Sequence, residues 1–172
     1  MAWMFKRRPK DLDSLHAAYT ELVGRARDPI FFAEWGVPDT LTGRFDMIAM
    51  HMALLFHRLS GEGEAASQFS QDLFDLFFRD MDRTLREMGV GDVGVPKRIE
   101  KMGSLFYGLS DALGKALVDP DPEAMVALMR RNLIDTDQTG DAEALAAYAR
   151  NEFARLKAIP AAGLIAPDKA QT

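Results

Sequence analysis

The sequence predicts an all-α fold, a compact single-domain bundle of about six or seven helices. Apolar residues recur at spacings of three and four along most of the chain, which is the pattern of helices with one buried face. No stretch alternates apolar and polar residues between turn signals, as a half-buried strand would. The length of 172 residues favours one domain, with a core large enough to fold without disulfides or a structural metal.

We divide the chain into a basic N-terminal segment (residues 1–10), a helical domain (11–158) and a flexible C-terminal tail (159–172). The first segment places apolar residues before basic ones, namely Trp3, Met4, Phe5, Lys6, Arg7, Arg8 and Lys10. One interpretation is a frayed terminus. The other is a weak peripheral membrane contact, in which aromatic rings lie at the interface and basic groups lie near anionic lipid.

Gly, Pro and Asp residues separate the expected helices. The first helix ends at Asp28-Pro29, because a residue before proline disfavours the helical conformation. Asp119-Pro120 ends another helix in the same way, and Pro96 suits the first turn of the helix that it begins. The helices are expected at residues 11–27, 30–35, 41–59, 64–88, 96–118, 122–133 and 141–158.

The helix at 41–59 is expected to lie at the centre of the bundle. Further apolar residues widen its apolar stripe until little polar surface remains, so neighbours must surround it. Asp39 or Thr42 is expected to cap its start. Its few polar residues lie at heptad spacing and form the one face that we expect to contact solvent: Arg44, His51 and Arg58.

The helix at 64–88 has a face rich in phenylalanine and methionine opposite a charged face. Acid-before-base spacing of four residues predicts two surface ion pairs, which are Asp75 with Arg79 and Asp82 with Arg86. Asp80 differs because it lies at the edge of the apolar face, where an unpaired carboxylate is costly. Its expected partner is one of the nearby cations Arg44, Lys97 and Arg98.

A basic cluster begins the helix at 96–118. Lys97, Arg98 and Lys101 lie in or near its first turn, where positive charge opposes the helix dipole. Basic side chains beside free backbone N–H groups form an anion-binding arrangement. The anion could be internal (Asp80, Asp82 or Asp92), or it could be an acidic group or phosphate on a partner. The sequence leaves both interpretations open.

The rest of the composition excludes several functions. The absence of cysteine excludes disulfides, thiolate zinc sites and a cysteine nucleophile. The net charge of −5 argues against direct nucleic-acid recognition. His51 and His57 point to different faces of one helix, so they do not form a metal site. We therefore expect no metal, no cofactor and no enzymatic activity. The ten methionines indicate either core filling or an adaptable apolar binding surface.

Two long motifs resemble a known family. The strings GVPDTLTGRFDM (36–47) and DLFDLFFRDMDRTLREMGVGDVGVPKRI (72–99), with FYG at 106–108 and RNL at 131–133, are similar to the ubiquinol–cytochrome c reductase chaperone family. The resemblance covers roughly Ala18 to Leu133. Thr42 stands where we expect an acidic residue, and Pro96 where we expect a small one.

The resemblance implies an assembly chaperone for the cytochrome bc1 complex. Mitochondrial members act with a small partner protein at the ribosomal exit tunnel, where they take up newly made cytochrome b. It therefore implies nascent cytochrome b as the client, with the ribosome exit region and a small partner protein as further contacts. It also fits a cytoplasmic protein, or one lying peripherally at the inner face of the cytoplasmic membrane. The alternative function is a helical interaction module with a different soluble partner.

The resemblance also implies candidate residues for client or partner binding. We hypothesise that the two motifs adjoin and form one charged rim beside an apolar surface rich in methionine and phenylalanine. The client would contact the apolar surface, and the rim would hold a partner or a polar loop of the client. The candidates are Asp39, Arg44, Phe45, Asp46, Asp75, Asp80, Asp82, Arg86, Asp92, Lys97 and Arg98.

Overall fold

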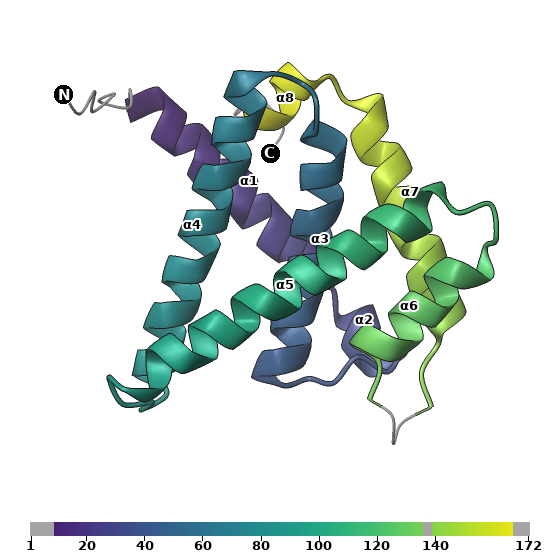
Figure 1. The fold of residues 1–172 in the computed structure, drawn as a ribbon, viewed down its shortest axis with the longest axis horizontal. Coiled ribbons are helices and arrows are strands. Elements are labelled where there is room, and N and C mark those ends of the chain that lie inside the picture. Colours follow the sequence, from purple (N-terminus) through teal and green to yellow (C-terminus); the bar gives the residue numbers. More distant parts are fainter. Residues whose placement is uncertain (1–8, 136–138, 167–172) are drawn as a thin grey trace.

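The computed structural model describes residues 9–135 and 139–166, and within them the chain forms eight helices and no strand (Figure 1). The all-α prediction is confirmed, and each expected helix is present with ends that differ by two residues at most. None of the described helices is long and apolar enough to cross a lipid bilayer. The helices are α1 (Pro9–Ala26), α2 (Pro29–Ala33), α3 (Leu41–Leu59), α4 (Glu64–Glu87), α5 (Gly94–Val118), α6 (Glu123–Leu133), α7 (Ala142–Ala158) and α8 (Ala161–Ile165).

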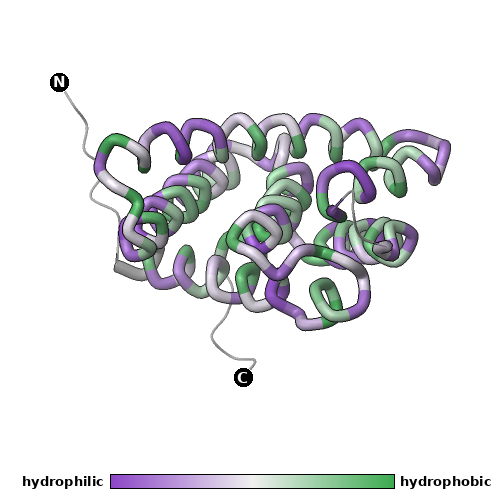
Figure 2. The backbone as a smooth tube through the Cα atoms, turned by 90° about the horizontal axis from the view of Figure 1, so that it is seen from below, coloured by the Kyte–Doolittle hydropathy of each residue, from purple (hydrophilic) through white to green (hydrophobic). Residues whose placement is uncertain are grey.

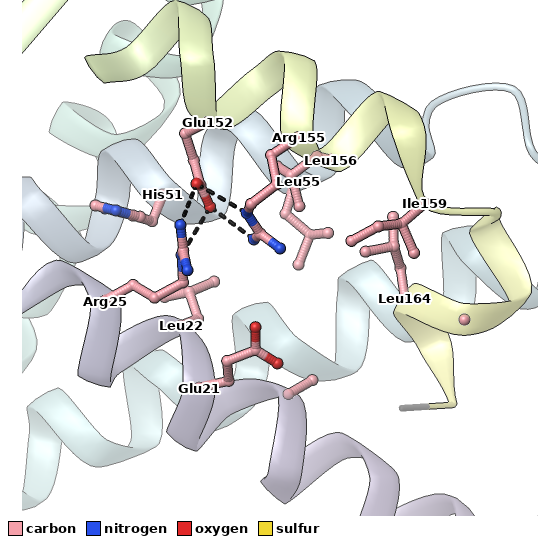
Figure 3. A pocket seen from close by; sticks show the side chains of 12 residues that line it. Glu21, Leu22, Arg25, His51, Leu55, Glu152, Arg155, Leu156, Ile159 and Leu164 are labelled. Carbon is pink, nitrogen blue, oxygen red and sulfur yellow. Dashed lines mark hydrogen bonds and ion pairs between the residues drawn. The ribbon is translucent and has the colours of Figure 1, made fainter. Parts of the chain in front are cut away.

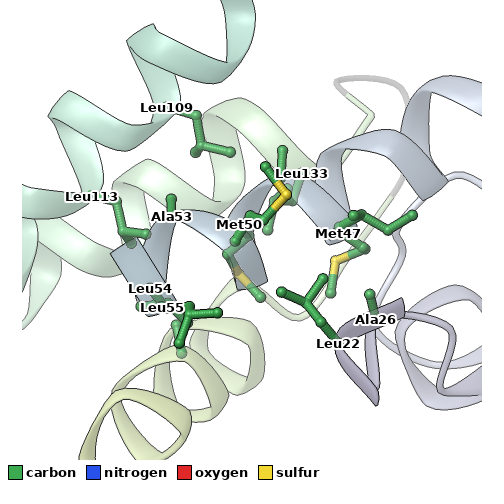
Figure 4. Packing of buried hydrophobic residues seen from close by; sticks show 14 of the residues in the cluster. Leu22, Ala26, Met47, Met50, Ala53, Leu54, Leu55, Leu109, Leu113 and Leu133 are labelled. Atoms are coloured by element: carbon green, nitrogen blue, oxygen red, sulfur yellow. The ribbon is translucent and has the colours of Figure 1, made fainter. Parts of the chain in front are cut away.

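Helix α3 lies at the centre of the bundle, as its apolar sequence predicts. It packs against α1, α4, α5, α6 and α7, and Figure 1 shows α5 crossing it while α6 and α7 lie on the side away from α4. Twelve of its 19 residues are buried. Met47 and Met50 occupy the middle of the core, with leucines from α1, α5 and α6 around them (Figure 4).

The long helices are amphipathic, so each one contributes one face to this core. Figure 2 shows apolar and polar residues alternating around the turns of the backbone. In α4 the buried residues recur at spacings of three and four, the period of one helix face. They are Ala66, Phe69, Leu73, Phe77, Met81 and Leu85.

The start of α3 differs from the prediction in its cap. Thr40, rather than Asp39 or Thr42, caps the helix, because its Oγ1 accepts a hydrogen bond of 3.1 Å from the N–H of Gly43. Asp39 instead pairs with Arg44 at 2.8 Å. A Cβ at Gly43 would lie 1.9 Å from the backbone oxygen of Pro38. Only glycine therefore lets the preceding loop fold back onto the helix.

The predicted C-terminal tail is partly helical. Residues Ala161–Ile165 form α8, which packs against α1 and α4. Ala161, Leu164 and Ile165 are partly buried against the core. We expected a loose tail because Pro160 ends α7. Its φ of −56° also places it as the N-cap of a new helix.

Candidate functional site

The N-terminal part of α5 and the turn before it form a protruding corner of the molecule (Figure 1). Its cations are Lys97, Arg98 and Lys101, and we call this surface the basic corner. All three side chains are exposed, and none has a hydrogen bond or ion pair with another described residue. The first turn of α5 contains no acidic residue and no side-chain cap. These cations therefore do not stabilise the fold through a partner in the described chain.

The nearby carboxylates Asp82 and Asp92, which could have paired with the basic corner, pair with Arg86 instead. Arg86 donates to Asp82 at 2.6 Å and to Asp92 at 2.7 Å, which ties the α4–α5 turn to the end of α4. The predicted pair of Asp82 with Arg86 is thus present. The structure therefore does not support the interpretation in which Lys97, Arg98 and Lys101 pair with a carboxylate of the chain itself.

Apolar side chains beside the basic corner are also exposed. Val93 is 80% exposed and Met88 is 61% exposed, and both belong to the turn between α4 and α5. Exposed apolar side chains next to unpaired cations are a combination found at interaction surfaces. This corner is the part of the predicted rim that is free to contact another molecule.

Asp80 has partners other than those predicted. It accepts a hydrogen bond of 2.9 Å from the hydroxyl of Tyr19 and pairs with Arg83 one turn further along α4. Burial, together with the hydrogen bond to Asp80, raises the pKa of Tyr19 above its usual range. Arg44, Lys97 and Arg98 were therefore wrong as partners. Tyr19 lies on α1, 61 residues away in the chain, and helical spacing alone cannot reveal such a contact.

The other predicted ion pair on α4, Asp75 with Arg79, is absent from the described structure. Asp75 accepts a hydrogen bond of 2.9 Å from Gln71, one turn earlier in the helix. Arg79 has no hydrogen bond or ion pair within the described chain. Asp75 and Arg79 are thus separate exposed groups on this face.

The two motifs meet through aromatic rings and not through charges. Phe45 is 2% exposed, and its ring stacks on that of Phe77 with centroids 5.4 Å apart. Phe45 therefore joins α3 to α4 inside the core. The charged residues of the first motif, Asp39 and Arg44, pair with each other.

Asp46 is a half-buried carboxylate without a partner. It has no hydrogen bond or ion pair with any described residue. Burial raises its pKa to about 7. An acidic group in this state is less stable when charged, because nothing replaces its lost hydration. Its cost to the fold makes Asp46 a candidate for a functional role.

An open groove lies between the C-terminal part of α3, the first half of α4 and the middle of α5. It has a volume of about 320 Å³, and we call it the aromatic groove. None of its lining residues is charged. They are Phe56, Leu59, Ser60, Ser67, Ser70, Gln71, Phe74, Phe106, Tyr107 and Ser110.

Four aromatic rings, one leucine, four serines and one glutamine line this groove, and methionine does not. Methionines fill the core instead, since Met47, Met50, Met52, Met125 and Met129 are fully buried. The core-filling interpretation is therefore confirmed for these five. Periodicity could not separate it from a methionine-lined groove, because both place methionine on the apolar face of a helix.

A second polar site was missed by sequence reasoning. Glu152 of α7 is 5% exposed and lies beside a small cavity of about 100 Å³ between α1, α3 and α7. Arg25 donates to its carboxylate at 2.5 and 3.0 Å, and Arg155 at 2.7 and 3.0 Å (Figure 3). Burial alone would raise the pKa of Glu152, but the two arginines outweigh it and lower the pKa to about 2.

His51 lies next to this carboxylate and is also buried (Figure 3). Its Nδ1 lies 2.8 Å from the Met47 carbonyl and its Nε2 lies 2.8 Å from the hydroxyl of Tyr148. A carbonyl can only accept, so Nδ1 carries the proton and Nε2 accepts from Tyr148. Burial lowers the pKa of His51.

The predicted solvent-exposed strip of α3 was therefore wrong for two of its three residues. His51 is buried, and Arg58 donates to the carbonyls of Leu156 and Ile159 at 3.2 and 3.0 Å. These bonds join α3 to carbonyls at the end of α7, where that of Leu156 also accepts from the N–H of Ile159. Arg44 alone is exposed as predicted.

The sequence did contain a signal for Glu152. Leu145, Ala149 and Leu156 are buried on α7, and Glu152 completes their spacing of four, three and four. A carboxylate on the apolar stripe of a helix needs a partner when the helix packs. One partner, Arg25, came from α1, 127 residues away, and the other, Arg155, lies three residues further along α7.

Known proteins are similar to this chain in sequence and in fold. Residues 33–169 match the model of a family described as ubiquinol–cytochrome C chaperone. The ubiquinol–cytochrome-c reductase complex assembly factor 1 of Xenopus laevis is 24% identical over 136 residues, which cover 78% of this chain and 68% of that protein. The crystal structure of the Cbp3 homolog from Brucella abortus superposes with a TM-score of 0.83 at 38% identity, covering 92% of this chain and 88% of the other.

The matched region contains every element of the basic corner and of the aromatic groove. Of the described helices, it leaves out α1 and most of α2. The resemblance that the two motifs indicated is thus confirmed over most of the chain. This chain belongs to the ubiquinol–cytochrome c chaperone family.

Proposed function

We propose that this protein binds newly made cytochrome b and holds it for assembly of the cytochrome bc1 complex, without catalysing a reaction. Family membership supports a role in bc1 assembly, and the Xenopus relative is named for assembly of that complex. The observation that carries the binding role is the basic corner. Its three unpaired cations lie beside exposed Met88 and Val93, and no described residue uses them to stabilise the fold.

The candidate residues then divide by what they touch. Lys97 and Arg98 are free to contact an acidic or polar loop of the client or of a partner protein. Arg86, Asp82 and Asp92 hold the turn that presents them. Phe45 positions α3 against α4. Four further exposed or half-exposed candidates remain in the proposal as part of the charged surface: Asp39, Arg44, Asp46 and Asp75.

Further contacts belong to the same proposal. A small partner protein and the ribosome exit region would bring the chaperone to its client as the client emerges. The protein would act in the cytoplasm, with residues 1–10 as the site of any peripheral contact with the inner face of the membrane. Residues 1–8 lie outside the described structure.

A gene deletion tests the proposal. Cells without this protein should lose membrane cytochrome b and bc1 activity, while other respiratory complexes stay normal. Complementation with Lys97→Glu and Arg98→Glu together should fail, and Lys115→Glu should succeed. Lys115 is a matched control because it is also exposed on α5 but pairs with Asp111 at 2.7 Å.

Any of three results would contradict the proposal or the binding surface that carries it. Normal cytochrome b in the deletion strain would show that the protein has another role. Capture of a soluble partner unrelated to bc1 would favour the interaction-module alternative. If the double variant does not fold, as judged by circular dichroism and cooperative melting, the basic corner stabilises the fold and is not a free binding surface.

A further inference from the structure

The aromatic groove is unusual because its whole lining is uncharged. Charged residues make up 27% of the chain, yet none of the ten lining residues is charged. The groove lies between the first half of α4 and the middle of α5, and residues at the end of α3 complete its lining. Figure 1 shows α4 and α5 diverging from their shared turn. The face of a segment bound in the groove would be desolvated against a lining that has no charged side chain.

Aromatic rings form one side of this groove and are partly open to solvent. Tyr107 is 63% exposed, and its ring centroid lies 5.6 Å from that of Phe74 and 5.7 Å from that of Phe106. Its hydroxyl has no hydrogen bond with any described residue. Phe56 of α3 continues the cluster, with its ring centroid 5.9 Å from that of Phe106. The exposed ring therefore extends a cluster that joins three helices.

We infer that the aromatic groove binds an uncharged, apolar α-helix of the client, of the kind that later spans the membrane. This inference rests on the proposed function and names the surface and the client segment. A charged segment would be desolvated in the groove without a partner, which is costly. An apolar helix lying in a groove is a common mode of recognition. The exposed hydroxyls of Ser67 and Tyr107 can bond to the small polar groups that membrane helices carry.

The positive charge of the basic corner complements the partial negative charge at the C-terminal end of a bound client helix. A helix of about 20 residues is about 30 Å long, so one bound in the groove extends along α5 toward its first turn, where Lys97 lies on the side of the helix nearer Tyr107. The C-terminal end of a helix carries partial negative charge. We therefore place the C-terminal end of the bound helix at the basic corner.

The probe for this inference is a synthetic leucine- and alanine-rich peptide of about 20 residues, with two aspartates at its C-terminus. Fluorescence anisotropy of the labelled peptide in mild detergent gives its affinity for the full chain. Tyr107→Asp should weaken binding at least about tenfold, which corresponds to the loss of one buried aromatic contact. Val118→Asp is the matched control, because Val118 is exposed on α5 outside the groove, and it should leave the affinity unchanged.

Two further variants sharpen this test. Ser67→Lys places a charge in the groove without removing an aromatic ring, and it should weaken binding even if Tyr107→Asp fails to fold. A peptide with two lysines at its C-terminus should bind more weakly than the aspartate peptide. That difference should disappear in the Lys97→Glu and Arg98→Glu double variant.

Several outcomes would overturn the inference. Equal affinity of the wild type, Tyr107→Asp and Ser67→Lys for the aspartate peptide would show that the groove is not the binding site, and no binding to the wild type would reject an apolar helix as its occupant. A dimer that sedimentation detects in the wild type and not in Tyr107→Asp would show that a second copy occupies the groove.

Complementation separates this inference from the proposed function. If the deletion strain loses cytochrome b and Tyr107→Asp restores it fully, the groove inference fails and the proposed function stands. If the deletion strain keeps normal cytochrome b, the proposed function fails first.

Discussion

The polar cluster at Glu152 and the basic corner both contain arginine side chains, but only the first provides a carboxylate for them. Glu152 is buried and accepts four hydrogen bonds from Arg25 and Arg155. Lys97, Arg98 and Lys101 are exposed and have no partner within the described chain. The first cluster joins α1 to α7 and stabilises the fold. The second contributes nothing visible to the fold and is available to another molecule.

This comparison predicts its largest effect at Glu152. Glu152→Gln should destabilise the protein by about 3 kcal/mol, because two arginines then lose their counter-charge next to a buried site. The value lies at the low end for such changes, since both arginines are about one-third exposed. Urea unfolding measures the loss. Glu143→Gln is the control, because Glu143 is exposed and pairs with exposed Arg130 at 3.2 Å; an equal loss in both variants would contradict the comparison.

Asp46 should give the next largest effect, with the opposite sign. Its pKa in the folded protein is raised to about 7, so the folded state holds the proton more tightly than the unfolded state. Stability from this group is present at low pH and falls as pH rises toward 7. Asp46→Asn should therefore stabilise the protein by about 2 kcal/mol at about pH 8 and have almost no effect at about pH 4.

Thermal melting at both pH values checks the prediction for Asp46. Asp111→Asn is the control, because Asp111 is exposed and paired with Lys115. A loss of stability at the higher pH in the Asp46 variant would mean that its carboxylate has a partner in solution.

Acid should remove the stabilising contribution of the Glu152 cluster. The pKa of Glu152 is lowered to about 2 in the folded protein, so its stabilising contribution is present above the unfolded pKa. That contribution is lost as pH falls through the folded value. The wild type should lose stability between about pH 4.5 and about pH 2, and Glu152→Gln should lose less over that range. Parallel acid profiles for the two proteins would contradict this.

The smallest effect is expected at the basic corner. The Lys97→Glu and Arg98→Glu double variant should not lower the free energy of unfolding, because these exposed side chains have no partners to lose. It should raise it by at most about 1 kcal/mol, because acidic side chains near a helix N-terminus interact favourably with the helix dipole. Urea unfolding at low salt measures it, with Lys115→Glu as the matched variant. A loss comparable with that of Glu152→Gln would show that the basic corner is internally paired.

The fold was largely predictable because helix periodicity and turn residues are local signals. The position of α3 followed from its apolar sequence, and the ends of the helices followed from Gly, Pro and Asp. Errors arose at helix ends, where several neighbouring residues can act as the cap or where one residue both ends a helix and begins the next. Pro160 both ends α7 and begins α8, and Thr40 took the capping role that its neighbours were expected to fill.

The polar contacts were less predictable because their partners lie far apart in the chain. Asp80 was recognised as a carboxylate in need of a partner, but Tyr19 could be identified only from the packing of α1 on α4. His51 seemed polar by spacing, yet Tyr148 of α7 covers it. The cations of the basic corner were visible in the sequence, because they oppose the dipole of their own helix, but the sequence left open whether they pair with an internal carboxylate.

The most direct test of the central claim is capture of newly made cytochrome b. Cells expressing the tagged protein would be pulse-labelled, and the captured chains would be identified. We predict that the wild type and Lys115→Glu recover labelled cytochrome b, and that the Lys97→Glu and Arg98→Glu variant recovers about tenfold less, as expected for the loss of about 1.4 kcal/mol of binding free energy. Equal recovery by all three proteins, or no cytochrome b with the wild type, would contradict the account.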